Sequence, residues 1–282
     1  ERRVRVRSSI TNLSPSRIVL GKASMMESPG PVLPDAEWSE VVNLSLAGEL
    51  FKRPIFRMSD PECPRTSKIK VQLFDRLGHR SVLIGFLTFL KADTVVACGY
   101  SEGRGLSGLT ASCDFAGYEL EPGECIPTEE FSAAWGSDPY TQLTDWADDA
   151  ARLNGARSWE EPPIGWIGWS WVDPFFVERY EDIVLRNAAA IERRLRGYGV
   201  GYVWVSLGNL KGIQPGDWLA WNYELFPNGP EYLGRRLGEH GLRWGLWCGA
   251  FYMSPIAPAA RNMEDALLRK PDGTLLVVRP PW

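Results

Sequence analysis

Histidine is almost absent from this sequence, and its absence excludes several chemistries. Only His79 and His240 occur among the 282 residues, and each stands beside a glycine, as in a turn or at a helix end. Neither a histidine-rich metal site nor a Ser-His-Asp constellation is therefore expected. The cysteines number five and include no C-x-x-C pair, which argues against a zinc knuckle and a complete disulfide framework. We expect no metal, and the cysteine pattern favours a reducing, cytoplasmic compartment.

Long apolar runs and an excess of positive charge are also missing. No run approaches the roughly 20 apolar residues of a membrane span, and the first ten residues lack the apolar core of a signal peptide. Lysine and arginine total 31 against 35 aspartates and glutamates, so no net positive field attracts nucleic acid or a membrane. The glycine-rich residues 103–108 precede no helix, which predicts a turn and no organic cofactor.

Tryptophan, by contrast, is abundant. Eight of the 13 tryptophans fall between residues 166 and 247: Trp166, Trp169, Trp171, Trp204, Trp218, Trp221, Trp244 and Trp247. An indole has a broad apolar face and one N–H donor, which suits both core packing and stacking on a sugar ring. The positions of these residues relative to the strands decide between the two uses.

The first 136 residues carry the pattern of an all-β sandwich. Strand-length runs occur at residues 3–7, 69–74, 81–90 and 94–98, separated by segments rich in proline, glycine, serine and aspartate. Residues 137–162 are predicted to form a connecting helix and a linker. There Asp138 is an N-cap before Pro139, and Asn154-Gly155 is a typical helix end.

Residues 163–282 alternate between strand and helix, as in an α/β domain. Strands are predicted at residues 164–171, 202–205 and 242–251. Two amphipathic helical patterns separate them, one ending at Gly197 and one that Asn228 caps at its start. This order indicates parallel βα units, in a barrel or a doubly wound sheet. The loops after the second and third strands lie at the edge where both architectures place their sites.

Several motifs in this second part occur in a recognisable order. They are the run from Pro163 to Trp171, Gly216-Asp217-Trp218, the run from Phe226 to Gly229, and the run from Gly245 to Cys248 leading to Met253-Ser254-Pro255. In order and spacing they resemble the α-galactosidases of glycoside hydrolase family 36 and the melibiase clan. The resemblance covers about residues 115–282 by motif and the earlier part by architecture.

The resemblance implies a fold and an activity. It implies a β-sandwich followed by a (β/α)8 TIM barrel that cleaves α-glycosidic bonds with retention, of which residues 163–282 hold the first three βα units. Such a reaction uses two carboxyl groups about 5–5.5 Å apart and needs no cofactor. A closed barrel takes about 250 residues by itself, so this chain is too short for both a sandwich and a barrel.

The same resemblance selects candidate substrate-binding residues. Trp169 and Trp247 match sugar-packing aromatics at the ends of the first and third strands, and Asp217 and Trp218 belong to a shared motif. Ser206 begins the stretch that reads galactose in the family. Core packing is the alternative for the tryptophans, and the ordering of a loop is the alternative for Asp217.

Two departures from the family pattern bear on activity. The paired aspartates that hold galactose hydroxyls are replaced by Ser206 and Leu207, so the identity of the sugar is not carried over. The nucleophile and the acid/base of the family end the fourth and sixth strands. The sequence stops before the fourth strand, so neither catalytic residue is expected within this chain.

Three functions stay open at this point. The first is the N-terminal portion of a glycosidase that acts on an oligosaccharide or glycoside, its barrel completed by a missing C-terminal part or a second polypeptide. The second is a non-catalytic carbohydrate-binding or scaffold remnant of that fold, and the third is a transglycosylase of the raffinose-synthase kind. A homo-oligomer is a further open alternative.

Overall fold

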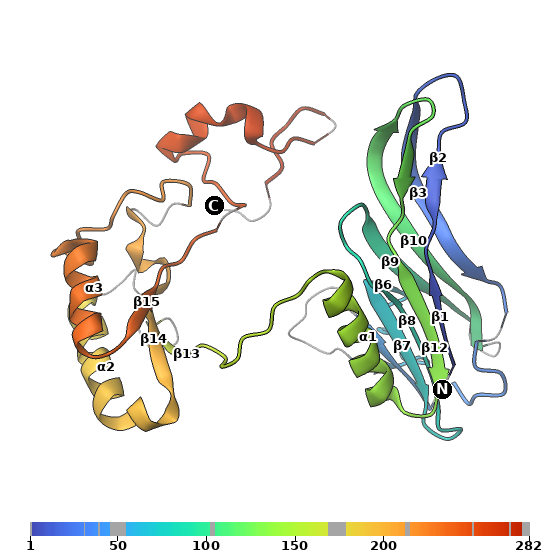
Figure 1. Ribbon diagram of the computed structural model, residues 1–282, viewed down its shortest axis with the longest axis horizontal. Helices are drawn as coiled ribbons and strands as arrows, with labels where there is room; N and C mark the ends of the chain where they lie inside the picture. The colour runs from blue at the N-terminus through green and yellow to red at the C-terminus, as the bar shows by residue number, and fades with distance from the viewer. Residues whose placement is uncertain are drawn as a thin grey trace. The chain divides into compact units, whose positions relative to one another are not determined.

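The structure is a computed structural model that describes residues 2–30, 32–38, 40–45, 55–101, 105–168, 179–211, 215–249, 251–270 and 272–277. The chain divides into two compact units, Glu1–Ser158 and Trp159–Trp282 (Figure 1). The division falls inside the predicted helix and linker at residues 137–162. Each unit is described by itself.

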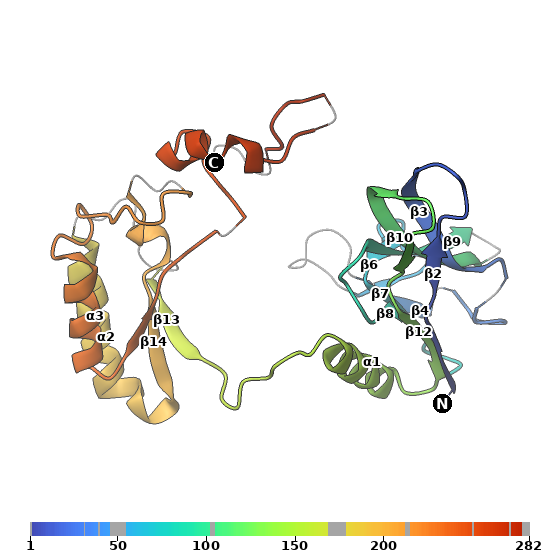
Figure 2. The same ribbon diagram turned by 45° about the horizontal axis from the view of Figure 1, so that its top comes forward.

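The first unit is a β-sandwich built from two antiparallel sheets. The larger sheet has six strands in the order β1 (Arg2–Val6), β12 (Phe131–Gly136), β8 (Arg80–Phe86), β7 (Lys70–Asp75), β4 (Val41–Ser45) and β5 (Ile55–Arg57). The second has four, in the order β3 (Ile18–Ser28), β10 (Gly105–Leu120), β9 (Asp93–Ser101) and β6 (Thr66–Lys68). A short ribbon joins β2 (Ser9–Thr11) to β11 (Cys125–Pro127). Figure 2 shows the sheets from a second direction.

Period-two alternation separates the two faces of the larger sheet. Leu73, Ile84 and Phe131 point into the core, where they join Leu109 of the second sheet in one buried cluster. The intervening residues of β7, β8 and β12 face the other way, toward the helix α1 (Pro139–Leu153). The larger sheet is therefore covered on both faces.

The predicted helix forms with the predicted ends. The Asp138 carboxylate accepts hydrogen bonds from the backbone N–H of Tyr140 at 2.9 Å and of Thr141 at 3.3 Å. Beyond the C-cap Asn154, Gly155 has a φ of +60°, the left-handed conformation that favours glycine. The buried side of the helix includes polar residues, because Gln142 and Asp149 are buried whereas Tyr140 is exposed.

Two predictions in this unit are wrong at their ends. The strand predicted at residues 81–90 ends at Phe86, because Glu129 organises the turn that follows by accepting a 2.5 Å hydrogen bond from Thr88 and a 2.9 Å bond from the Ala92 N–H. The turn predicted at residues 103–108 is wrong from Gly105 onward, where β10 begins. Gly105 has a φ of +70° and lies against the Trp38 indole, so a residue with a Cβ would not fit at this position.

The second unit contains a parallel sheet of three strands. Its order is β13 (Ile164–Ile167), β14 (Val200–Trp204) and β15 (Arg243–Gly245). The helices α2 (Tyr180–Leu195) and α3 (Gly229–Glu239) lie side by side on one face of this sheet in both views (Figures 1 and 2). Short 3₁₀ turns occupy Arg196–Tyr198, Ser206–Asn209, Pro258–Asn262 and Glu264–Ala266.

The core of this unit confirms the helical patterns. Val184, Ala188 and Ile191 of α2 are buried with Leu233 and Leu237 of α3. A 2.7 Å contact between His240 Nδ1 and Glu192 Oε2 ties the end of α3 to α2, and the His240 ring holds the pKa of that carboxyl below its usual range. His240 therefore has a structural partner.

The start of α3 is held differently from the prediction. Asn228 occupies the N-cap position, but its side chain makes no capping bond to the helix. The buried Glu181 of α2 instead accepts 2.6 Å and 3.4 Å hydrogen bonds from the amide and the backbone N–H of Asn228. A carboxylate from the neighbouring helix thus holds the residue that was predicted to cap α3.

Candidate functional site

Two of the predicted residues, Trp218 and Trp247, meet beyond the carboxyl ends of adjacent strands. Trp218 lies in the loop after β14, and Trp247 lies two residues after β15 ends. Their ring centroids are 6.0 Å apart and the ring planes are inclined by 49°. Both side chains are half-buried. The fold therefore brings together two indoles that are far apart in sequence.

Asn209 fixes the backbone of Trp247. Its Oδ1 accepts a hydrogen bond from the Trp247 N–H at 3.2 Å, and its Nδ2 donates to the Trp247 carbonyl at 3.4 Å. Asn209 is 5% exposed, so water competes little for this pair of bonds. The third strand was predicted to span residues 242–251, but it is only Arg243–Gly245. Beyond its end the Asn209 amide, rather than a neighbouring strand, pairs with the backbone of Trp247.

The loop that carries Trp218 is closed by backbone pairing. Leu210 bridges to Trp221, and the Lys211 N–H donates to the Ala220 carbonyl at 3.3 Å. Gly216 has a φ of +113°, and a Cβ there would lie 2.8 Å from Met253 Cγ. The glycine of the Gly216-Asp217-Trp218 motif is thus required by both conformation and packing.

Asp217 is half-buried beside Trp218. Its backbone carbonyl accepts a 3.2 Å bond from the Ala220 N–H, but its carboxylate makes no hydrogen bond or ion pair with another residue in the described part of the chain. The described residues therefore give no support to the alternative in which this carboxylate orders the loop.

The remaining predicted residues are only partly described. Ser206 begins the 3₁₀ turn that follows β14, and its side chain is outside the described part, as is that of Leu207. Trp169 also lies outside the described residues, so β13 is seen only to Ile167 and not to the predicted residue 171.

Other tryptophans of this unit belong to its core. The rings of Trp221 and Trp244 meet edge to face at 5.8 Å, and Trp221 also packs on Phe226 at 5.4 Å. Trp166 contacts the same buried cluster. Trp204 lies on the sheet face opposite the helices and is 37% exposed. Core packing therefore accounts for Trp166, Trp221 and Trp244.

Sequence reasoning missed a buried tyrosine near this edge. Tyr180 is fully buried against Phe226, and burial raises its pKa to about 12. Its hydroxyl has no hydrogen-bond partner among the described residues. A Cβ built on Gly168 would lie 1.8 Å from this hydroxyl, so the tyrosine abuts the backbone just after β13. In the sequence, the glycine at position 168 is the feature that indicates a side chain packed against the backbone there.

Two further observations concern the described residues only. None of their helices combines the length and the apolar character needed to cross a bilayer. Their histidine, cysteine, aspartate and glutamate side chains form no group of three or more arranged to hold a metal ion.

Comparison with known proteins identifies the fold. No family model matches the chain, and no curated protein matches it by sequence. Among solved structures, the galactosidase domain of an α-galactosidase–sucrose kinase has a TM-score of 0.67 at 16% identity and covers 95% of this chain and 39% of its own. An α-galactosidase from Lactobacillus brevis gives 0.63 at 16% identity, covering 95% and 37%. The family 36 enzyme AgaB from Geobacillus stearothermophilus gives 0.62 at 17%, covering 94% and 38%.

These matches share one architecture with this chain. The chain has the fold of part of the glycoside hydrolase family 36 α-galactosidases, and it spans about two fifths of the length of the structures it matches.

Proposed function

We propose that this chain is the N-terminal portion of a retaining glycosidase that acts on α-linked sugars. The observation that carries the proposal is the Trp218–Trp247 pair, which stands beyond the carboxyl ends of two neighbouring parallel strands. Barrel enzymes place substrate at this edge. The likeness of fold to family 36 α-galactosidases supports the same assignment.

In this proposal β13, β14 and β15 are the first three strands of a (β/α)8 barrel. Both helices cover one face of the sheet, and Val203 is buried beneath them whereas the next residue, Trp204, faces the other way. That second face would line the barrel interior. There the Arg243 guanidinium donates to the Tyr202 hydroxyl at 3.2 Å, which gives the face a polar pair from adjacent strands.

The described residues supply recognition in this mechanism. The apolar faces of Trp218 and Trp247 would receive the C–H face of a sugar ring, and Asp217 would accept hydrogen bonds from its hydroxyls. Cleavage needs two carboxyl groups that flank the scissile bond. We assign both to strands that follow β15 in the complete barrel, supplied by a C-terminal part or by a second polypeptide.

The ligand class follows from the neighbours. Structures of AgaA variants from Geobacillus stearothermophilus are complexes with raffinose and with stachyose, both oligosaccharides. We propose that this chain likewise binds an α-linked oligosaccharide or glycoside. The sugar at the cleaved end is left unassigned, because Ser206 and Leu207 replace the two carboxylates that resembling enzymes use there.

That replacement favours a second candidate, a non-catalytic carbohydrate-binding protein with this fold. Losing two charge-assisted acceptors weakens sugar recognition by several kcal/mol while leaving the stacking surface intact. A raffinose-synthase-like transglycosylase is a variant of the first proposal, since it differs in the acceptor rather than in the binding of the donor sugar.

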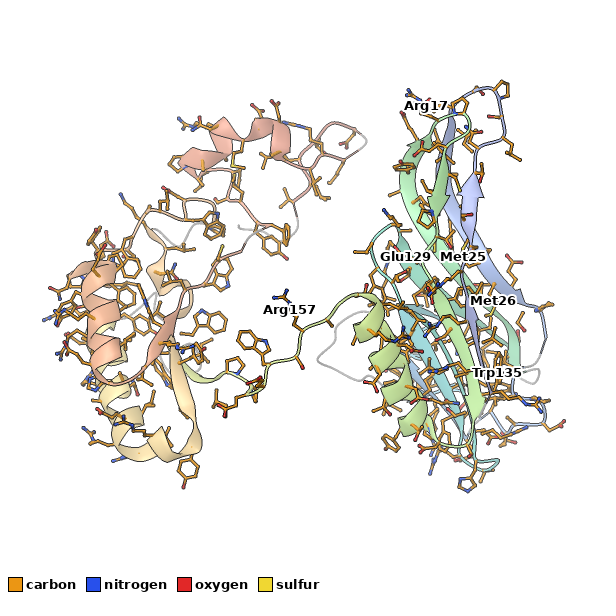
Figure 3. The ribbon with its side chains drawn as sticks, in the orientation of Figure 1. Arg17, Met25, Met26, Glu129, Trp135 and Arg157 are labelled. Atoms are coloured by element: carbon orange, nitrogen blue, oxygen red, sulfur yellow. The ribbon has the colours of Figure 1, made fainter. Side chains whose placement is uncertain are left out.

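Titration with raffinose tests the proposed site. We expect the ¹⁵N-indole resonances of Trp218 and Trp247 to shift saturably, with a Kd of about 1 mM, and p-nitrophenyl α-galactoside to stay uncleaved by this chain alone. Trp218→Ala should abolish the shift at Trp247. Trp135→Phe, an exposed position on β12 (Figure 3), is the matched control and should not affect it. Unmoved resonances with raffinose and with stachyose would remove the proposed site.

A further inference from the structure

The first unit contains a cavity that the proposed function does not use. It has a volume of about 250 Å³ and lies between the larger sheet and α1. Its lining consists of Arg3, Leu83, Ser132, Ala134, Gln142, Asp145 and Trp146. These residues come from three strands and one helix, so the cavity is built by the fold rather than by one loop.

Strand register explains the floor of the cavity. Arg3, Ala134 and Leu83 are direct neighbours across β1, β12 and β8, and Ser132 pairs with Gly85 in the adjacent row. The central positions of both rows are small. Because alanine and serine stand where larger side chains would reach the helix, a space is left beneath α1. Next to this space the Trp146 indole packs against Gly85, where a Cβ would lie 2.4 Å from Trp146 Nε1.

The roof comes from one side of α1. Gln142, Asp145 and Trp146 are spaced so that they share one face of the helix, over the floor. The Trp146 indole donates from Nε1 to the Phe86 carbonyl at 3.0 Å, which fixes the ring in place. Gln142 is 1% exposed and is held by the Ser81 carbonyl at 3.3 Å. Two hydrogen bonds to the sheet thus hold the roof in place.

Polar groups in the lining have unused capacity. Ser132 is 2% exposed, and its hydroxyl makes no hydrogen bond to another described residue. Within the described part, Asp145 has only a long contact of 3.8 Å to Arg3, whose guanidinium also binds Asp149 at 3.0 Å. A buried hydroxyl without a partner costs free energy unless a ligand or water satisfies it.

We propose that this cavity binds one sugar ring, as a second carbohydrate site separate from the Trp218–Trp247 pair. The lining combines an indole surface with a hydroxyl, a carboxylate, a guanidinium and an amide, which together match a ring with an apolar face and several hydroxyls. An apolar ligand would cover the Ser132 hydroxyl without offering it a hydrogen bond, whereas the Asp145 side chain is 46% exposed and stays hydrated. The volume is below the roughly 300–1,000 Å³ of pockets for drug-sized ligands, so the site holds one ring and not an oligosaccharide.

The test follows the ¹⁵N-indole resonance of Trp146 in the full chain, with D-galactose, D-glucose and sucrose as separate probes. We expect a saturable shift of this resonance with at least one of them. Ala134→Leu fills the floor and should abolish it, whereas Trp247→Ala, in the other unit, should leave it unchanged. The proposed site and this cavity are therefore read out by different resonances.

Two mild variants keep the test decisive if Ala134→Leu does not fold. Ser132→Ala and Asp145→Asn should each weaken the binding about tenfold, as expected for one lost hydrogen bond to a sugar hydroxyl. Asp148→Asn, an exposed change on the same helix, should not weaken it. An unmoved Trp146 resonance with all three sugars, a shift that survives both mild variants, or an equal shift with sodium acetate would overturn the proposal.

Discussion

At the scale of single residues, the Asn209 side chain makes the hydrogen bonds that a neighbouring strand would otherwise make. Beyond β15 the backbone of Trp247 pairs with Asn209 rather than with another backbone. The two partners are 38 residues apart, so no local pattern predicts their contact. The amide fixes the position of one indole relative to the other, and this is what a stacking surface needs before a ligand arrives.

Asn209→Ala should therefore damage both stability and binding. Removing a buried amide that makes two hydrogen bonds is expected to lower the free energy of unfolding by about 1–3 kcal/mol, because the Trp247 backbone groups lose their partners. Raffinose affinity should fall with it. Chemical denaturation and the indole titration measure the two effects. Asn187→Ala is the control, since among the described residues the Asn187 side chain bonds only to the Ile183 carbonyl of its own helix. An equal loss there would contradict the assigned role.

For Tyr180 we expect a change in the free energy of unfolding of the opposite sign. Its buried hydroxyl has no partner in the described part of the chain, so Tyr180→Phe removes a desolvation cost while it keeps the ring against Phe226. We expect the free energy of unfolding of the second unit to be unchanged or to rise by about 1 kcal/mol. Tyr140→Phe, at an exposed position, should change nothing. A marked destabilisation by Tyr180→Phe would show that the hydroxyl has a partner.

At the scale of elements, charged side chains join β1 to α1. The alternation of arginines along β1 predicts a strand with one polar face, and that face turns toward the helix. Asp149 of α1 forms ion pairs with Arg5 Nη2 at 2.7 Å and with Arg3 Nη1 at 3.0 Å. Glu130, the residue before β12, forms ion pairs with Arg5 Nε at 3.2 Å and Arg7 Nε at 2.5 Å. The helix is thus held to the sandwich by ion pairs as well as by Trp146.

The Asp149 network makes the first unit acid-sensitive. Burial acts to raise the pKa of this carboxyl, but hydrogen bonds from Arg5 and Arg152 outweigh it, so the pKa lies below its usual value. A carboxyl with a depressed pKa adds stability that is complete above the unfolded pKa of about 3.9 and is lost as pH falls through the folded value.

Asp149→Asn should accordingly destabilise the first unit at pH 7 by about 1–3 kcal/mol, with a smaller difference at pH 3. Thermal unfolding at the two pH values, with Asp148→Asn as the exposed neighbour control, measures it. A difference that does not depend on pH would contradict a charge-based role for Asp149.

Elements that carry their own boundary signals are those that the sequence predicts. The ends of α1 follow from Asp138 and Gly155, which act within one turn of the helix. Other ends depend on distant side chains: Glu129 sets the end of β8, and Glu181 holds the start of α3. Those contacts exist only in the folded chain, so periodicity and capping rules cannot supply them.

The candidate site divides in the same way. Motif resemblance selects Trp218, Trp247 and Asp217, and their role toward a ligand stays a prediction. Asn209 and Tyr180 are not found, because their roles concern the backbone and core behind the site. The cavity between α1 and the larger sheet is also missed, since it arises where Ser132 and Ala134 of β12 lie beneath the helix, and that placement depends on the strand register.

At the scale of the whole molecule, the chain consists of two units with separate cores. The segment between α1 and β13 is exposed along its length and contains Arg157 (Figure 3). We expect limited trypsin digestion to cut first after Arg157 and to release a folded first unit. Arg157→Gln should slow that cut, as followed by mass spectrometry and circular dichroism. First cuts within β7 or β8 would contradict separate units.

We propose that this chain is the first part of a larger glycosidase, whose barrel begins with β13, β14 and β15. The intact mass of the polypeptide purified from its native source tests this proposal. We expect a mass far above the 31.6 kDa of these 282 residues. A native polypeptide of 31.6 kDa that acts without a partner chain would contradict it.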